Sequence, residues 1–423
     1  MVWSPSGRRL GDRVRRVIML TGAIALVAAA CVGVESAEAP TAPTTALPDP
    51  TSTAGEPDTT TTIAGAAQGV LPTGESALSN MRADEFPDPL IPVEEIISGG
   101  PPPDGIPPIE NPVFLPVAEN LQILDPSEPV VALEIDGDAR AYPIRAMVWH
   151  EIVNDVVGGV PVSVTYCPLC NSAVTYVRVI NGVETTFGTS GRLFASALVM
   201  YDRATESLWT HYDGRAVVGL LTGAQLEAVA SPLLSWGDFR ENHPTGQVLD
   251  WTQTGHNRDY GRNPYYGYDD PATQPFLFRG TVDDRAVAKQ RVVGVAVDDA
   301  AAAFTLEGIS GGEARATNAT VGERPVVIFW KAGQSSALDT QDQATGKDVG
   351  SVGVFDPVID RDLLTFTAQG GVFVDDQTSS AWSITGEAVD GPLAGSQLER
   401  LEHLDTFWFA WATYQPDTVL VEQ

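Results

Sequence analysis

The sequence repeats itself, and this repetition constrains the fold more than any other feature. The segment VVALEIDGDARAY at 130–142 aligns without a gap with VVGVAVDDAAAAF at 292–304. Further along the chain, Asp202, Thr205, Ser207 and Trp209 recur as Asp375, Thr378, Ser380 and Trp382. Because the matches keep their order and spacing, they predict two similar halves, 128–252 and 290–423, joined by a connector rich in Tyr, Gly and Pro at 253–289.

Each half has the alternation that is typical of β-strands. In the first half we expect strands at 130–135, 162–166 and 173–180, a hairpin at 198–209, a short helix at 235–241 and a strand at 248–251. This pattern predicts a β-rich α+β fold. Neither half alone is large enough for a generous core, so we expect two similar tandem halves packed as a pseudo-twofold pair.

The charge of the chain excludes one class of partner. Asp and Glu number 55 against 25 Lys and Arg, which gives a formal net charge of −30. Phosphate would repel so acidic a body, so we expect no nucleic-acid partner. We also expect no polybasic membrane contact, because the only lysines are Lys289, Lys331 and Lys347.

The N-terminus predicts export. Five arginines precede the apolar run VIMLTGAIALVAAAC at 17–31, the order found in secretory signals. Three alanines before Cys31 resemble a bacterial lipobox, in which this cysteine becomes the lipidated first residue. An uncleaved anchor over 17–34 and a secreted protein are the alternatives. We expect a protein held at the outer face of the cytoplasmic membrane or on the cell surface.

The rest of the organisation follows from composition. A Thr- and Pro-rich segment cannot offset its ordering entropy by burial, so it should be a disordered linker. The predicted ranges are a signal peptide at 1–31, this linker at 32–78, a Pro-rich extended lead-in at 79–127, and then the two halves with their connector.

Cys167 and Cys170 give the strongest local signal. They lie in the string YCPLCN at 166–171, between two strand patterns. Two thiolates in one tight turn can bind a metal ion or close a small disulfide ring. A thioredoxin-like site would need a helix after the second cysteine. Here a strand pattern follows, so we predict a hairpin knuckle. The second cysteine pair of a zinc ribbon is absent, so non-cysteine ligands or water would have to complete a metal site.

The second half offers an internal control for these residues. In the register of the repeat, KAGQ at 331–334 replaces CPLC at 167–170. The same register replaces three further candidates of the first half, His150, Met200 and His211, by Ala314, Phe373 and Ile384. The fold therefore does not need these side chains, and any chemistry should lie in the first half. A hydrogen-bonded structural role for the two histidines and a core role for Met200 remain open alternatives.

Several strings resemble the prokaryotic domain-of-unknown-function family 3179. They are GGPPPDGIP at 99–107, HEIVND at 150–155, TYCPLCNSA at 165–173, FGTSG at 187–191, LVMYDR at 198–203, SLW at 207–209 and RDYGRNP at 258–264. The resemblance extends from about residue 96 to the C-terminus. It implies no established activity.

Three functions fit these residues. The first is a metal site formed by His150, Cys167 and Cys170, with Met200, His211 or water as a further ligand. Cys with Met would suit copper, and Cys with His would suit zinc. The second is a thiol-disulfide oxidoreductase in which Cys167 attacks. The third is a binding or structural module with an inert disulfide.

The first function depends on where His150 lies. A turn at Gly158-Gly159 would fold its segment back, antiparallel to 162–166, and return it towards Cys167.

Overall fold

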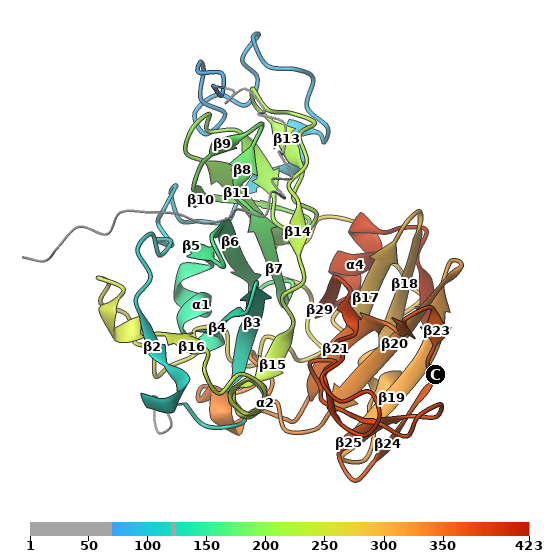
Figure 1. The fold of residues 1–423 in the computed structure, drawn as a ribbon. Helices are drawn as coiled ribbons and strands as arrows, with labels where there is room; N and C mark the ends of the chain where they lie inside the picture. Colours follow the sequence, from blue (N-terminus) through green and yellow to red (C-terminus); the bar gives the residue numbers. More distant parts are fainter. Residues whose placement is uncertain (1–69, 120–123, 423) are drawn as a thin grey trace, which may run out of the picture. The chain divides into compact units, whose positions relative to one another are not determined.

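The computed structural model describes residues 70–119 and 124–422. Strands predominate in this part of the chain, and its α-helices are short (Figure 1). The predicted β-rich α+β class is confirmed. The signal at 1–31, Cys31 and most of the linker lie outside the described residues.

Three sheets form the first half and its lead-in. The first has the order β15 (Leu233–Ser235), β3 (Pro129–Ile135), β4 (Asp138–Pro143), β16 (Gln247–Leu249) and β2 (Phe114–Pro116). The second has the order β14 (Ala228–Val229), β7 (Ser172–Val177), β6 (Val160–Cys167) and β5 (Ile152–Val157). The third has the order β1 (Ile97–Ser98), β10 (Phe187–Phe194), β11 (Ala197–Asp202), β12 (Leu208–Thr210) and β13 (Ala216–Val218). The pair β8 (Val179–Ile180) and β9 (Val183–Glu184) forms a small ribbon.

Three further sheets form the second half. The first has the order β29 (His403–Phe407), β17 (Arg291–Val297), β18 (Ala300–Thr305) and β30 (Val419–Val421). The second has the order β19 (Ala314–Val321), β20 (Arg324–Lys331), β21 (Ser351–Asp356) and β28 (Glu399–Arg400). The third has the order β24 (Phe366–Gln369), β25 (Val372–Asp375), β26 (Ala381–Trp382) and β27 (Ala388–Asp390). Here β22 (Val358–Ile359) and β23 (Asp362–Leu363) form the ribbon.

Four α-helices complete the fold: α1 (Ile144–His150), α2 (Trp236–Asn242), α3 (Leu306–Ile309) and α4 (Trp408–Tyr414). The 3-10 helices are η1 (Val93–Glu95), η2 (Val117–Glu119), η3 (Trp251–Gln253) and η4 (Gln343–Thr345). The helix expected at 235–241 is α2, whose N-cap Ser235 accepts from the Asp238 N–H. The strand expected at 248–251 ends at Leu249, and Trp251 belongs to η3.

The strand orders of the two halves can be compared sheet by sheet. The order β15-β3-β4-β16 has its counterpart in β29-β17-β18-β30, with the last pair parallel in both. Trp209 and Trp382 each donate from Nε1 to an aspartate of the neighbouring strand, Asp202 or Asp375, at 3.0 Å. These observations agree with a repeat. The duplication and the pseudo-twofold packing stay predictions, which superposing 130–252 on 292–421 would test.

The turn that matters most for the site joins β5 and β6. Gly158 and Gly159 have φ values of 55° and 81°, which glycine adopts without strain. A Cβ at Gly158 would lie 2.4 Å from the Ile135 carbonyl oxygen, so no other residue fits there. The turn sets an antiparallel register in which Ile152 faces Thr165. The predicted return of the chain along 162–166 is therefore confirmed.

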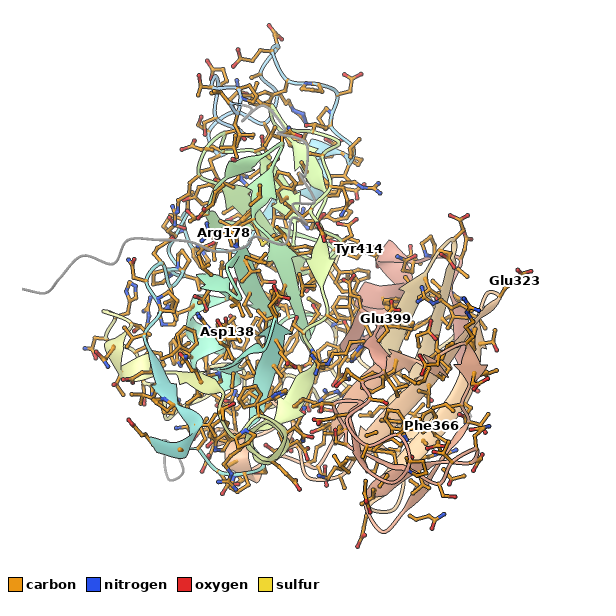
Figure 2. The ribbon with its side chains drawn as sticks, in the orientation of Figure 1. Asp138, Arg178, Glu323, Phe366, Glu399 and Tyr414 are labelled. Atoms are coloured by element: carbon orange, nitrogen blue, oxygen red, sulfur yellow. The ribbon has the colours of Figure 1, made fainter. Side chains whose placement is uncertain are left out.

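The two halves share one core. A single cluster of buried apolar side chains includes Tyr166 and Trp209 of the first half and Phe329 and Trp408 of the second. Tyr414 of α4, labelled in Figure 2, stacks on Tyr212 with ring centroids 4.4 Å apart. Each half thus buries apolar surface that it could not cover alone.

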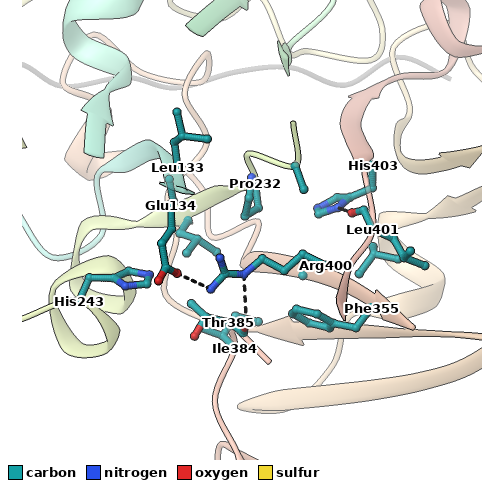
Figure 3. A pocket seen from close by; sticks show the side chains of 15 residues that line it. Leu133, Glu134, Pro232, His243, Phe355, Ile384, Thr385, Arg400, Leu401 and His403 are labelled. Atoms are coloured by element: carbon teal, nitrogen blue, oxygen red, sulfur yellow. Dashed lines mark hydrogen bonds and ion pairs between the residues drawn. The ribbon is translucent and has the colours of Figure 1, made fainter. Parts of the chain in front are cut away.

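A small cavity also lies between the halves. There Arg400 donates to Glu134 at 2.8 Å (Figure 3). The cavity volume is about 20 Å³, which is room for a water molecule and not for a substrate.

The folded body begins before the predicted lead-in. Leu71 and Ala77 are buried, so the body includes the last residues of the range 32–78 that we assigned to the linker. Among the helices of the described residues, none is long and apolar enough to span a bilayer.

Candidate functional site

The Cys-x-x-Cys motif lies in a hairpin turn. Strand β6 ends at Cys167, residues 168–171 form the turn, and β7 begins at Ser172, which pairs with Cys167. Asn171 has a φ of 52°, a left-handed conformation that Asn tolerates better than most residues. The predicted knuckle is confirmed. Both thiols are free and buried.

Cys170 begins a chain of hydrogen bonds through the interior. Its Sγ lies 3.0 Å from the Ser172 Oγ, which lies 3.0 Å from the His211 Nε2. The His211 Nδ1 lies 2.9 Å from the Thr165 Oγ1, which donates to the Val174 carbonyl at 2.6 Å.

The direction of this chain follows by elimination. A carbonyl only accepts, so the Thr165 hydroxyl proton points to Val174 and Thr165 must accept from the His211 Nδ1–H. The His211 Nε2 is then the acceptor for Ser172, while the Cys170 S–H donates to the Cys167 carbonyl at 3.8 Å. Burial lowers the pKa of His211 to about 3, so the ring is neutral at neutral pH, as this arrangement requires.

The two thiols have opposite electrostatic surroundings. Burial would raise the pKa of the Cys167 thiol, but hydrogen bonds from the Cys170 side chain and from the backbone of Leu198, Cys170 and Leu169 outweigh it, and the pKa is lowered. Burial, together with the neighbouring Cys167, raises the pKa of Cys170 well above its usual value. Cys167 is therefore the thiol that ionises first.

Glu151 lies beside Cys167, and our sequence reasoning did not select it as a site residue. It is the C-cap of α1 with a φ of 58°, a strained position for a non-glycine residue. Its N–H donates to the Met147 carbonyl and its carbonyl accepts from the Tyr166 N–H, both at 2.8 Å. Burial, and secondarily the charge of Cys167, raise the pKa of the Glu151 carboxyl well above its usual value. The side chain is 7% exposed.

A pocket of about 480 Å³ borders these residues. Its wall includes Glu151, Leu169 from the cysteine turn, Leu198 from β11, and several aromatic side chains of the connector, Tyr265, Tyr266, Tyr268 and Phe276. This volume is in the range of small-molecule sites. Cys167 is 1% exposed and is not itself among the residues that line this pocket.

His150 faces a different environment. Its Nδ1 donates to the Pro107 carbonyl at 2.6 Å, and its Nε2 accepts from the Tyr260 hydroxyl at 2.7 Å. Burial lowers the pKa of His150 to about 4, so it is neutral. Both ring nitrogens are thus occupied by non-sulfur partners. Met200 is buried on β11 between Thr189 and Trp209, in the same apolar core as the cysteines.

No group of three or more His, Cys, Asp or Glu residues within 70–119 and 124–422 has the geometry of a metal site. The structure joins Cys170 to His211 through Ser172, but the hydrogen bonds of His150 go to Pro107 and Tyr260. The predicted metal site of His150, Cys167 and Cys170, with Met200 or His211, stays a prediction.

The second half holds the cysteine turn in place. The Cys170 carbonyl accepts from the Thr406 hydroxyl at 2.8 Å and from the Phe407 N–H at 3.1 Å. The Asn171 side chain donates to the Asp405 carbonyl at 3.3 Å, and Asp405 itself forms a buried ion pair with Arg291. The turn is therefore clamped between β7 and β29, which limits its freedom to open.

The repeat carried a signal for the residues that sequence reasoning missed. In the predicted register of the repeat, Glu151 and Thr165 align with Arg315 and Phe329, so they differ between the two segments in the same way as the cysteines do. In the strand pairing, Ser172 lies opposite Cys167 and Ser351 lies opposite Lys331.

Comparison with known proteins gives one result. A family model described as "Protein of unknown function (DUF3179)" matches residues 103–418, well over half of the chain. No curated protein and no solved structure matches this chain.

Proposed function

The chain belongs to the DUF3179 family, and from this premise we propose that Cys167 and Cys170 form a thiol-disulfide couple, the centre of an extracytoplasmic oxidoreductase. The observation that carries the proposal is the asymmetry of the two thiols. Hydrogen bonding lowers the pKa of the Cys167 thiol, whereas burial raises the pKa of the Cys170 thiol. A nucleophile that ionises beside a resolving thiol that stays protonated is the arrangement that sequential exchange requires.

The exchange proceeds in two steps. The Cys167 thiolate attacks one sulfur of a substrate disulfide, the substrate S–S bond breaks, and the other sulfur leaves with the electron pair. Cys170 then loses its proton and attacks the Cys167 sulfur, which closes the Cys167–Cys170 disulfide and releases the second substrate thiol. Two electrons pass from the protein to the substrate.

Two observations favour this function over the metal site. Both nitrogens of His150 already have partners, so the histidine would have to leave them to reach a metal ion. His211 approaches Cys170 only through Ser172.

The test is an equilibrium titration of the full chain in glutathione redox buffers, with alkylation and mass measurement of the free thiols. We expect one two-electron transition with a midpoint above about −300 mV, the limit below which structural disulfides lie. A midpoint below that limit would indicate an inert disulfide. Stoichiometric copper or zinc in the same sample, prepared without chelators, would instead support the metal site.

We also propose that the chain is exported and anchored to the membrane through Cys31, which lies outside the described residues. The support is the charged-then-apolar order of residues 8–31 and the three alanines before the cysteine. Changing Cys31→Ala should release the protein from the membrane fraction or block its processing, as followed by fractionation and the size of the product. Retention in the membrane at full precursor length would favour an uncleaved anchor.

A further inference from the structure

The pocket of about 480 Å³ near the cysteine turn combines one unpaired carboxyl with several open aromatic rings. From this combination we propose that the pocket binds a small organic ammonium ion with an apolar body. The Glu151 carboxylate is the partner of its charge, and aromatic side chains of the connector surround it. The site is separate from the thiol-disulfide couple, because neither Cys167 nor Cys170 lines the pocket. The inference therefore stands whether or not the cysteines are redox-active.

Glu151 provides the negative charge of the site. Of the described residues that line the pocket, it is the only acidic one. The residue is more than nine-tenths buried. No group of the described residues forms a hydrogen bond with its carboxyl oxygens, and neither oxygen is sealed from solvent. Since this pocket is the cavity that Glu151 lines, its open carboxyl oxygens face the pocket.

The carboxyl of Glu151 lacks a positive partner. Burial raises its pKa well above the usual value, and no basic side chain of the described residues opposes this effect. Arg192 is the basic residue of the pocket wall, but its Nη2 donates to the carbonyl of Leu78, which does not line the pocket. A cation inside the pocket would supply the missing charge and favour the ionised carboxyl. Asp and Glu outnumber Lys and Arg by 55 to 25, so the field of the whole chain also attracts cations.

Aromatic rings provide the second element of the site. Tyr265, Tyr266, Tyr268 and Phe276 line the pocket. The Lys289 Nζ lies 4.5 Å from the centroid of the Tyr268 ring, so this ring already faces a cation. No Lys or Arg of the described part of the chain lies over the other three rings. Their free faces can attract an ammonium ion through cation–π contacts.

The Tyr265 hydroxyl is a further open polar group beside Glu151. Burial, and secondarily the charge of Glu151, raise the pKa of this hydroxyl, so the two groups lie within reach of each other. Like the carboxyl, the hydroxyl has no hydrogen-bond partner among the described residues and is not sealed from solvent. Both groups can accept hydrogen bonds from the N–H groups of a protonated amine.

The rest of the pocket sets the size and the character of the ligand. Ile106, Leu169 and Leu198 contribute apolar side chains to the wall. A few polar groups in an otherwise apolar cavity of this volume are typical of small-molecule sites. The ligand that fits is therefore a protonated amine attached to a compact apolar body.

The test compares the binding of three probes of similar size to the full chain by isothermal titration calorimetry. The probe 2-phenylethylammonium carries the proposed charge, 2-phenylethanol is neutral, and 3-phenylpropionate is negative. We expect the ammonium ion to bind at one site about 10-fold or more tightly than the alcohol, as a charge-assisted hydrogen bond implies, and the carboxylate not to bind. Because this comparison needs no variant, it decides the question even if a variant fails to fold.

Variants assign the effect to the residues. Glu151→Gln should weaken binding of the ammonium ion by about 10- to 100-fold and leave the alcohol unchanged. Glu227→Gln, which removes the charge of an exposed glutamate outside the pocket, is the matched control and should change neither affinity. Tyr266→Leu keeps an apolar side chain at an exposed position and should weaken only the ammonium ion, by about 2- to 5-fold.

Three results would overturn the inference. The first is equal affinity for the ammonium ion and the alcohol, or no binding of either. The second is equal weakening of the ammonium ion in Glu151→Gln and Glu227→Gln, which would indicate the field of the whole chain instead of a contact. The third is equal weakening of both probes in Glu151→Gln, which would give Glu151 a role in the shape of the pocket alone. None of these results affects the redox titration of the cysteines, so the two proposals fail separately.

Discussion

Replacement of Cys167 by Ser should slow disulfide exchange by about 1000-fold or more, since removing a catalytic nucleophile costs at least this much in enzymes that depend on one. The serine hydroxyl does not ionise near neutral pH, so it is a far weaker nucleophile than the Cys167 thiolate. The measurement is the rate of thiol release from 5,5′-dithiobis(2-nitrobenzoate) by the reduced full chain. The fold should survive, because Ser is nearly the same size as the buried Cys167 that it replaces.

Cys170→Ser is the matched control for this prediction. This variant keeps the attacking sulfur, so it should release one equivalent of thiol and then stop as a mixed disulfide on Cys167. Mass measurement of the intact chain would show the added half of the probe. If Cys170→Ser were the inactive variant and Cys167→Ser formed the mixed disulfide, the roles of the two cysteines would be reversed.

Local patterns predicted much of the first half. The strand at 130–135, the knuckle at 167–170 and the helix at 235–241 depend on period-two alternation, turn residues and a Ser N-cap, which all act over a few residues. The Gly158-Gly159 turn also fixes its register locally, because its two glycines adopt positive φ. Such elements can be identified in a single sequence.

The site could be predicted only in part, because its other groups come from distant segments. Glu151, Leu198 and aromatic residues of the connector such as Tyr265 line one pocket, and no local pattern indicates this meeting. His150 and Glu151 show a further limit. Helix α1 ends between them, and the left-handed C-cap sends the imidazole towards Pro107 and the carboxyl towards Cys167. Adjacent residues thus face different environments, which spacing alone could not distinguish.

The second large effect concerns stability in acid. Burial lowers the pKa of His211 to about 3 and that of His150 to about 4, against an ordinary value of 6.5. Folding therefore keeps both rings neutral, and their contribution to the free energy of unfolding is fully present above pH 6.5. Below this pH the unfolded chain binds protons that the native chain excludes, so stability falls until the native rings titrate.

The size of the effect follows from the pKa of His211. Each pH unit between the unfolded and folded pKa values costs about 1.4 kcal/mol, so His211 alone would cost about 4 to 5 kcal/mol by pH 3. This loss is comparable with the whole stability of many domains, which is about 5 to 15 kcal/mol. Buried carboxyls such as Glu151 act in the opposite sense above pH 4.5, because the native chain keeps their protons. The dependence of the unfolding free energy on pH is therefore the sum of the contributions of several groups.

A difference between two proteins isolates His211. A Gln at this position can donate to the Thr165 oxygen and accept from Ser172, so His211→Gln keeps the chain of hydrogen bonds without a titrating ring. Urea unfolding at pH 7, 5.5 and 4 should show the wild type losing about 1.4 kcal/mol per pH unit below pH 6.5 relative to the variant, while the carboxyl contributions cancel. If the unfolding free energies of the wild type and of His211→Gln changed equally with pH, the His211 ring would accept a proton in the native state. In that case Ser172 could no longer donate to the His211 Nε2, and the hydrogen-bond directions derived above for Ser172 and His211 would be wrong.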